Sequence, residues 1–334
     1  MKKYTIIPDV LTVESNADNL HYFSFGFFHD LYKKSEVGTA PVKARFTLVD
    51  RIPEQVKKKK FDYYFQTDEG ILYDHGFLFG KRLRFLLRDS EAYDIDFVCE
   101  RDYYNLIKLN LESVAPPALV FFRYILSKML EKKILPLHCS AFNYQGQGNV
   151  LIAASNTGKS FTAFSFVEKK DAQLLTEDVL AFDGRELKAC HSVSVYSTYI
   201  NNNSTLRSLL SMVPYVFSFG DRQPFYDYFT EQKYKDTSAL DRIFIIERGD
   251  RNSVESLDPK NAVNLITLLN EFEFNYIANS LYMAEAYFKS SSQVETIRKH
   301  SEKLIEQLVK GRECYYVNGK DHEEIYRLVQ QITG

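Results

Sequence analysis

The chain has 334 residues, of which 45% are hydrophobic and 26% are charged, and its formal net charge is −2. A chain of this length and composition can bury a sizeable core, and it is longer than one typical small domain, so we expect two globular domains. The near-zero net charge excludes a global field that would attract nucleic acid. Because no apolar run reaches about eighteen residues, we also expect no membrane-spanning helix and no membrane partner.

The four cysteines, Cys99, Cys139, Cys190 and Cys314, are far apart and form no C-x-x-C pair. This spacing indicates neither a disulfide framework nor a cysteine metal site, and it is typical of a reducing compartment. The first residues contain lysines but no apolar segment, so the sequence predicts no secretory signal and a cytoplasmic protein. Oligomerisation is left open.

Residues 1–112 predict a β-rich domain. Short runs of β-branched and aromatic residues alternate there with turn signals such as Asp68-Glu69-Gly70. The predicted strands are 21–28, 42–49, 61–66, 70–73, 82–88 and 95–99. His29 and His75 have no carboxylate or cysteine at ligand spacing, so we interpret both as structural. With no chemistry assigned, a recognition or interface role is the remaining expectation for this domain.

The lysine run Lys57-Lys58-Lys59-Lys60 has two interpretations. It could contact a phosphate or a peptide, or it could be a solvated loop between strands. The second interpretation is the more common one for a short charge run, and we favour it.

A second domain is predicted over residues 113–334. It opens with a linking helix at about 115–131, in which prolines fall in the first turn and apolar residues then follow at helical spacing. The later predicted elements are a strand at 242–247, helices at 260–269 and 293–308, a strand at 314–317 and a closing helix at 321–332.

The clearest motif in the chain is residues 153–160, Ala-Ala-Ser-Asn-Thr-Gly-Lys-Ser. It matches a phosphate-binding loop, G-x-x-x-x-G-K-[ST], at every defined position but the first. An apolar strand-like run precedes it at 149–152, and a helix-compatible run follows at 161–168. Backbone N–H groups at a helix N-terminus, aided by the helix dipole, favour an anionic phosphate. The predicted nucleotide-binding residues are Ala154, Ser155, Asn156, Thr157, Gly158, Lys159, Ser160 and Phe161.

Two side chains of this loop have expected roles with ATP and Mg²⁺. Lys159 would reach the β- and γ-phosphates, and the Ser160 hydroxyl would take one Mg²⁺ position. The departure from the motif is Ala153, where glycine is usual. Alanine costs little if the backbone there has a negative φ, and it is strained if φ must be positive.

The surroundings of the loop resemble the C-terminal domain of HPr kinase/phosphorylase, and more closely the wider set of HPr-kinase-like serine kinases in the phosphoenolpyruvate-carboxykinase-type P-loop group. The resemblance covers about residues 135–184: His138 in a strand before the loop, a turn at 145–148, the loop, and the acidic pair Glu177-Asp178 after a further strand. A weaker likeness covers 240–250. The resemblance implies an α+β or α/β fold with a mixed sheet and ATP-dependent transfer to a serine hydroxyl.

The resemblance also implies roles for three residues. Asp178 aligns with the family's catalytic base, Glu177 with a ligand of Mg²⁺ or of its waters, and His138 with a residue near the phosphate. The alignment into the acidic pair needs one extra residue in the turn at 169–172, so the two acidic roles could be exchanged. For His138 the alternative is a structural histidine satisfied by backbone groups at a strand start.

Three basic residues are further candidates. Arg248, after the strand at 242–247, either supplies positive charge to the transferring phosphoryl group or caps the strand. Arg222 and Lys235 lie in the aperiodic segment 217–237, where they are either phosphate contacts or solvated loop charges.

Two departures from the family bear on the reaction. Glu177 replaces the first aspartate of the usual pair, and residues 196–210 lack the glycine-containing segment tied to phosphorolysis. The kinase half of the family chemistry therefore carries over better than the phosphorylase half. We expect a kinase acting on a serine of a peptide, a protein or a free amino acid. A nucleotide-binding regulatory module without turnover is the alternative, and carboxykinase-type decarboxylation ranks last because its metal-binding His and Lys residues cannot be placed.

Overall fold

The computed structural model describes residues 1–17, 21–22, 25–26, 40–77, 80–106, 117–190, 233–276 and 279–334. These residues form two compact units with a mixed α/β architecture and two mixed sheets. The first unit comprises described residues of 1–132 and 276–298, and the second those of 133–275 and 299–334. This division groups the linking helix with the β-rich unit, whereas the sequence assigned it to the second domain. His29, Arg222 and the segment 196–210 lie outside the described residues.

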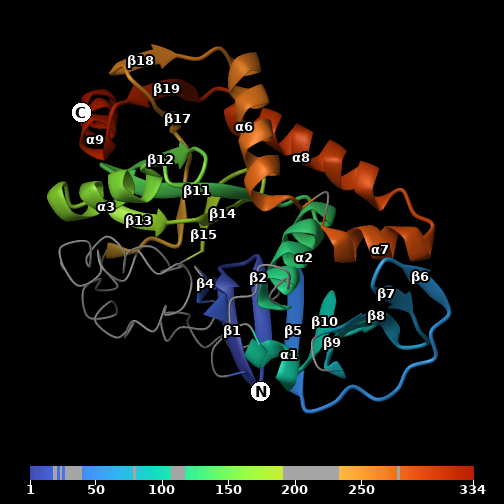
Figure 1. The fold of residues 1–334 in the computed structure, drawn as a ribbon. Coiled ribbons are helices and arrows are strands. Elements are labelled where there is room, and N and C mark those ends of the chain that lie inside the picture. Colours follow the sequence, from blue (N-terminus) through green and yellow to red (C-terminus); the bar gives the residue numbers. More distant parts are fainter. Residues whose placement is uncertain are drawn as a thin grey trace. The chain divides into compact units, whose positions relative to one another are not determined.

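The first unit is built on an eight-stranded sheet (Figure 1). Strand β5 is parallel to its neighbours β2 and β10, and the remaining neighbours are antiparallel. The spatial order is β1 (Lys2–Ile7), β2 (Leu11–Ser15), β5 (Val42–Val49), β10 (Ile95–Glu100), β9 (Arg82–Arg88), β8 (Gly70–Gly76), β7 (Tyr64–Gln66) and β6 (Lys59–Phe61). Strands β3 (His21–Tyr22) and β4 (Phe25–Gly26) form a separate pair.

The predicted strands of this unit match the structure in some cases and differ from it in others. The expected strands at 42–49 and 82–88 have the bounds of β5 and β9. The strand expected at 61–66 is instead the hairpin β6–β7, because Asp62 turns the chain with a left-handed φ of 54°. The strand expected at 70–73 is longer than predicted, because β8 continues to Gly76.

Aromatic rings form much of the core of the first unit. Phe97 stacks on Phe46 and Phe85 with centroid separations of 5.4 and 4.5 Å. Helix α2 (Pro117–Glu131) packs on this layer through Phe121, whose ring lies 5.2 Å from Phe46. Helices α1 (Arg101–Leu106) and α7 (Ser280–Lys289) complete the described helices of the unit. The high aromatic content of the chain is therefore used in part to pack helices against this sheet.

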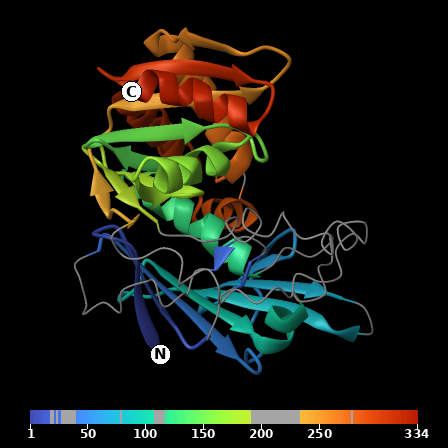
Figure 2. The ribbon, with the colours of Figure 1, turned by 90° about the vertical axis from the view of Figure 1, so that its left-hand side faces the viewer.

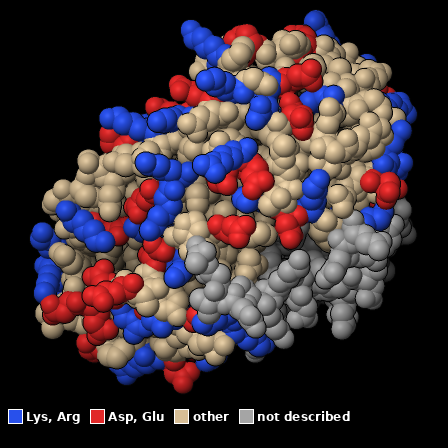
Figure 3. Space-filling view, turned by 180° about the vertical axis from the view of Figure 1, so that it is seen from behind, with Lys and Arg blue, Asp and Glu red and all other residues tan. Residues whose placement is uncertain are grey.

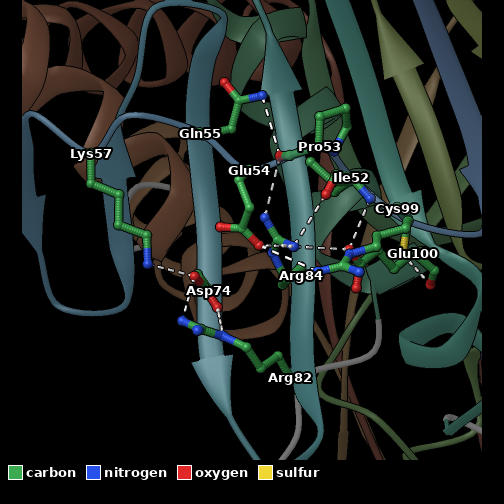
Figure 4. Close-up of polar contacts among 11 residues, drawn as sticks. Ile52, Pro53, Glu54, Gln55, Lys57, Asp74, Arg82, Arg84, Cys99 and Glu100 are labelled. Carbon is green, nitrogen blue, oxygen red and sulfur yellow. Dashed lines mark hydrogen bonds and ion pairs between the residues drawn. The ribbon is translucent and has the colours of Figure 1, made fainter.

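Buried ion pairs fix the segment between β5 and β6 (Figure 4). Arg84 is 4% exposed and donates to the Ile52 carbonyl at 3.2 Å and to Glu100 at 3.3 Å. Beside it, Asp74 accepts two hydrogen bonds from Arg82 and lies 2.5 Å from Lys57 Nζ. Buried charges are tolerated when they are paired in this way.

The lysine run at 57–60 is therefore divided between two environments. Lys57 pairs with Asp74 and Lys58 pairs with Asp68, whereas Lys59 and Lys60 are exposed on β6 at the edge of the sheet. Lysines on an edge strand oppose pairing with another chain. The favoured interpretation of a solvated loop between strands therefore holds only in part, because Lys59 and Lys60 lie in strand β6 and Lys57 pairs with the buried Asp74 carboxylate.

The second unit contains a nine-stranded sheet that carries the loop motif. Strands β12, β17 and β19 are parallel neighbours, and the other pairings are antiparallel. The spatial order is β16 (Thr237–Ser238), β15 (Leu187–Ala189), β14 (Val179–Phe182), β11 (Leu135–Tyr144), β12 (Gln147–Ile152), β17 (Arg242–Arg248), β19 (Glu313–Gly319) and β18 (Ser253–Ser256), and β13 (Gln173–Thr176) also pairs with β11.

Helices cover this sheet. Helices α3 (Lys159–Lys169) and α9 (His322–Thr333) lie side by side against it (Figures 1 and 2). Their buried face includes Phe166 and Val329, which share one apolar cluster with Phe142 of β11 and Phe244 of β17. The remaining described helices are α6 (Pro259–Phe274), which packs on β11 and β17, and α8 (Gln293–Val309). Helix α6 extends beyond the predicted end at 269, and the added turn reaches the candidate site.

Charge on the visible surface is mixed in sign. On the face drawn in Figure 3, lysines and arginines are interspersed with aspartates and glutamates. Among the described helices, none is both long enough and apolar enough to span a bilayer. All four cysteines are buried as free thiols.

Candidate functional site

The loop at residues 153–158 joins β12 to α3, which is the strand–loop–helix arrangement that the motif requires. Ala153 is 1% exposed in the apolar cluster, and it is not among the non-glycine residues with positive φ. The left-handed conformations fall instead on Asn156, with φ 65°, and on Gly158, with φ 116°. Alanine at the first motif position is therefore compatible with the backbone, whereas Gly158 is required.

Gly158 is constrained by its neighbour as well as by its conformation. A Cβ atom on Gly158 would lie 2.7 Å from Nδ1 of His322, the first residue of α9. The N-cap of α3 at Gly158 has no side-chain hydrogen bond, so no side chain caps the helix there. The N-terminus of α3 keeps the geometry of an anion-binding position.

Lys159 is folded back onto the loop. Its Nζ donates to the carbonyl oxygens of Ala153 at 3.0 Å and Ala154 at 3.4 Å, and the residue is 6% exposed. Burial lowers the pKa of Lys159, and the nearby carboxylates of Asp178 and Glu273 oppose this effect only in part. The loop thus contains a buried cation close to two acids.

Strand register brings His138 to the acidic pair. In the antiparallel pairing of β11 with β14, His138 lies opposite Val179, and the Cys139 N–H donates to the Asp178 carbonyl at 3.1 Å. On the other side of β11, Cys139 lies opposite Ile152, the last residue before the loop. His138 Nε2 is 2.9 Å from Asp178 Oδ1. The ring is thus held by a carboxylate, not by the backbone.

The two acids of the pair lie in different environments. They form the turn between β13 and β14, where the sequence expected a strand end. The Asp178 side chain is 15% exposed and contacts His138, whereas Glu177 is 1% exposed. The Glu177 carbonyl accepts from Ser140 Oγ at 2.6 Å, and Ser140 Oγ is 3.5 Å from Ser160 Oγ. Asp178 is therefore the acid that a bound molecule can reach more easily.

A third acid, Glu273, completes the group, and sequence reasoning missed it. It lies in the last turn of α6, where its Oε1 accepts from the Ser155 N–H at 2.6 Å and its Oε2 accepts from Ser155 Oγ at 2.8 Å. The missed signal was Asn275, which ends the helix in a left-handed C-cap with φ 47°. Recognising that cap would have extended the predicted helix and placed Glu273 on it.

Asn270, one turn before Glu273, fixes α6 to β11. Its Oδ1 accepts from the His138 N–H at 2.9 Å, and its Nδ2 donates to the Pro136 carbonyl at 2.9 Å. Asn270 is 1% exposed. This clamp holds the end of α6 beside the loop and beside His138.

The two basic candidates that the structure describes, Arg248 and Lys235, have no recorded contact with this group. Arg248 is exposed at the end of β17, where its Nε donates to the Lys320 carbonyl at 3.3 Å. Lys235 pairs with Leu174 through its backbone N–H at 3.0 Å. Within the described ranges, no set of three or more His, Cys, Asp and Glu side chains is arranged to hold a metal ion.

Comparison with known proteins does not identify a family for this chain. No protein-family model matches the chain, and no curated protein matches it. Among solved structures, the Hpr(Ser) kinase/phosphatase from Coxiella burnetii is similar over 60% of this chain and 96% of its own, with 9% identity and a TM-score of 0.27.

Proposed function

We propose that residues 153–160 bind the phosphates of Mg·ATP and that the chain is a kinase transferring the γ-phosphoryl group to a serine hydroxyl of a peptide, a protein or a small molecule. The observation that carries the proposal is the convergence of Lys159, His138 and Asp178 at the loop end of three neighbouring strands, β12, β11 and β14. Phosphoryl transfer depends mainly on positioning and on cations near the leaving oxygens, and this group supplies both requirements.

The loop would hold the phosphates with its backbone N–H groups and with Lys159. The Lys159 ammonium donates to two carbonyls of its own loop, Ala153 and Ala154, and would exchange these for phosphate oxygens of higher charge. Residues 154–161 would form the cradle, as the motif predicts.

The oxygen donors at the loop fit Mg²⁺. This ion usually keeps several waters and binds one or two protein oxygens together with substrate phosphates. Ser160 would supply a hydroxyl, and Glu177 would act through a water molecule because its carboxylate is buried. When bound, Mg²⁺ would neutralise charge developing on the β- and γ-oxygens.

Asp178 would accept the proton of the acceptor hydroxyl. A general base must come within hydrogen-bond reach of that proton, and Asp178 is the partly exposed acid of the pair. The His138 Nε2–H group donates to Asp178 and would hold its carboxylate in orientation.

Replacing Lys159 with alanine tests the nucleotide site. Removing the ammonium should weaken ADP binding by about a hundredfold or more, because charge-assisted hydrogen bonds to phosphate are lost. Isothermal calorimetry with ADP·Mg²⁺ measures the affinity, and circular dichroism checks that the variant is folded. Unchanged affinity in a folded variant would refute the assignment.

A nucleotide-binding regulatory module without turnover is the second candidate. The observation that favours it is Glu177, an acid that replaces aspartate in the family pattern and is buried. ATP consumption measured against hydroxyl-bearing peptides, proteins and amino acids separates the two functions. Tight ATP binding with no consumption under any acceptor would favour the regulatory module.

A further inference from the structure

The loop already holds an anion that belongs to the chain itself. Glu273 accepts one hydrogen bond from a loop N–H and one from a loop hydroxyl, both of Ser155. Backbone N–H groups at the start of a helix are the donors that a phosphate would use. The carboxylate is also close enough to Lys159 to affect its ionisation. Glu273 thus occupies a position in which a phosphate oxygen would find both a donor and a cation.

This contact is not needed to hold α6 in place. Asn270 already fixes the helix to β11 through two buried hydrogen bonds. Ser155 is exposed at the tip of the loop, and the Glu273 side chain is 14% exposed. The bonds between Ser155 and Glu273 can therefore break without undoing the packing of the helix.

A second position for the Glu273 carboxylate lies next to the first. His138 Nδ1 is a buried atom with no hydrogen-bond partner among the described residues, and the His138 side chain is 9% exposed. The nearest Glu273 oxygen, Oε2, is 3.9 Å from Nδ1, just beyond hydrogen-bond distance. Buried polar atoms are rarely left without a partner. A ring with N–H groups on both nitrogens would donate to Asp178 through Nε2 and could donate to the Glu273 carboxylate through Nδ1.

We infer that Glu273 is a resident anion of the phosphate-binding loop and that a nucleotide phosphate displaces it. The displaced carboxylate then accepts a hydrogen bond from Nδ1–H of His138, whose ring takes a proton from solvent and so carries N–H groups on both nitrogens. This inference rests on the proposed nucleotide site. Glu273 then has two effects. It competes with phosphate for the loop, and after displacement it positions the ring whose other nitrogen contacts Asp178.

The test is the affinity for ADP·Mg²⁺ of the wild-type chain, Glu273→Gln and the control Glu271→Gln. Glutamine keeps the shape of Glu273 but removes the charge that competes with phosphate. We expect Glu273→Gln to bind ADP about tenfold to a hundredfold more tightly, which corresponds to the loss of one charge-assisted competitor. Glu271 lies on the same helix, and the structure records no side-chain hydrogen bond or ion pair for it among the described residues. The control should bind within about twofold of the wild type.

The second readout is the ¹⁵N resonance of His138 Nδ1, assigned by its loss in a His138 variant. ADP should shift this resonance in the wild type and in Glu271→Gln, and should shift it much less in Glu273→Gln. A folded Glu273→Gln variant that binds ADP equally or more weakly would overturn the inference, while measurable binding by the wild type would leave the nucleotide site standing. If none of the three proteins bound ADP·Mg²⁺ or inorganic phosphate, both the inference and the nucleotide site would be refuted.

Discussion

Lys159 is a single residue whose burial lowers the stability of the fold at neutral pH. Because burial disfavours its charged form, the folded chain binds this proton less tightly than the unfolded chain does. Stability therefore rises with pH between the folded and unfolded pKa values, and below both the buried ammonium destabilises the fold. Functional groups often carry such a cost.

Replacement of Lys159 by methionine should reveal this cost. Methionine keeps an unbranched stem but carries no charge, so we expect an unchanged or higher melting temperature together with loss of ADP binding. Thermal unfolding and calorimetry on the same sample measure the two effects. A fall of more than about 4 °C, equivalent to roughly 1 kcal/mol or more, would show that the hydrogen bonds to Ala153 and Ala154 outweigh the burial cost.

Substitutions of Asp178 and Glu177 are expected to affect different properties, phosphoryl transfer for Asp178 and the Mg²⁺ requirement for Glu177. Asp178→Asn should keep ATP binding and slow phosphoryl transfer by about 10²- to 10⁴-fold, the range for loss of a general base. Glu177→Gln should raise the Mg²⁺ requirement more than it lowers turnover at saturating Mg²⁺. Initial rates across a Mg²⁺ titration measure both variants. The reverse pattern would exchange the two roles, and full activity in both would make the pair structural.

At the scale of elements, local sequence patterns predicted the helices and strands around the loop. They did not predict contacts between residues far apart in the sequence. The strand–loop–helix around Lys159 follows from an apolar run, a glycine and a helical run, all local signals. The contact between His138 and Asp178 was not predicted, because it depends on the register of β11 with β14. The C-cap at Asn275 could have placed Glu273 on α6, but not beside the loop, since α6 reaches the loop from more than a hundred residues away along the chain.

The clamp made by Asn270 provides a test at this scale. Asn270→Ala would leave the His138 N–H and the Pro136 carbonyl without their partner, and we expect a loss of about 2 to 4 kcal/mol in the free energy of unfolding. Urea denaturation measures it. Phe272→Ala, on the same helix at 74% exposure, should change stability by about 0.5 kcal/mol or less. Equal effects of the two substitutions would contradict the clamp.

At the scale of the whole molecule, the pH dependence of stability involves buried carboxylates of the first unit that are paired with basic side chains. Burial raises the pKa of Asp96, but hydrogen bonds from Arg45 and Arg88 more than offset this, and the net pKa is lowered. Burial likewise raises the pKa of Glu285, but the neighbouring Lys128 and Lys289 more than offset this effect, and the net pKa is lowered. A carboxyl with a lowered folded pKa stabilises the fold above its unfolded pKa and loses this contribution as the pH falls through the folded value.

Acidification should therefore destabilise the chain, and Asp96 should account for part of the effect. We expect the melting temperature to fall as the pH is lowered from 5 toward 2, about the range over which such carboxylates become protonated. In Asp96→Asn the overall stability should be lower at neutral pH and the fall on acidification should be smaller. Differential scanning calorimetry across this range measures both slopes, and parallel curves for the two proteins would count against the assignment.

Each unit is built from segments that are far apart in the sequence, so neither can be completed early in synthesis. Buried Lys128 pairs at 3.0 Å with Glu285, and Tyr124 donates to the same carboxylate at 2.6 Å, so the first unit lacks a core partner until α7 has been made. The second unit likewise needs residues 299–334. At a typical rate of about 5–20 residues per second, residues 133–285 take roughly 8–30 s to translate. For that interval the nascent chain leaves Tyr124 and Lys128 of α2 without their partner Glu285, and both units become complete only after residues 276–334 have been made.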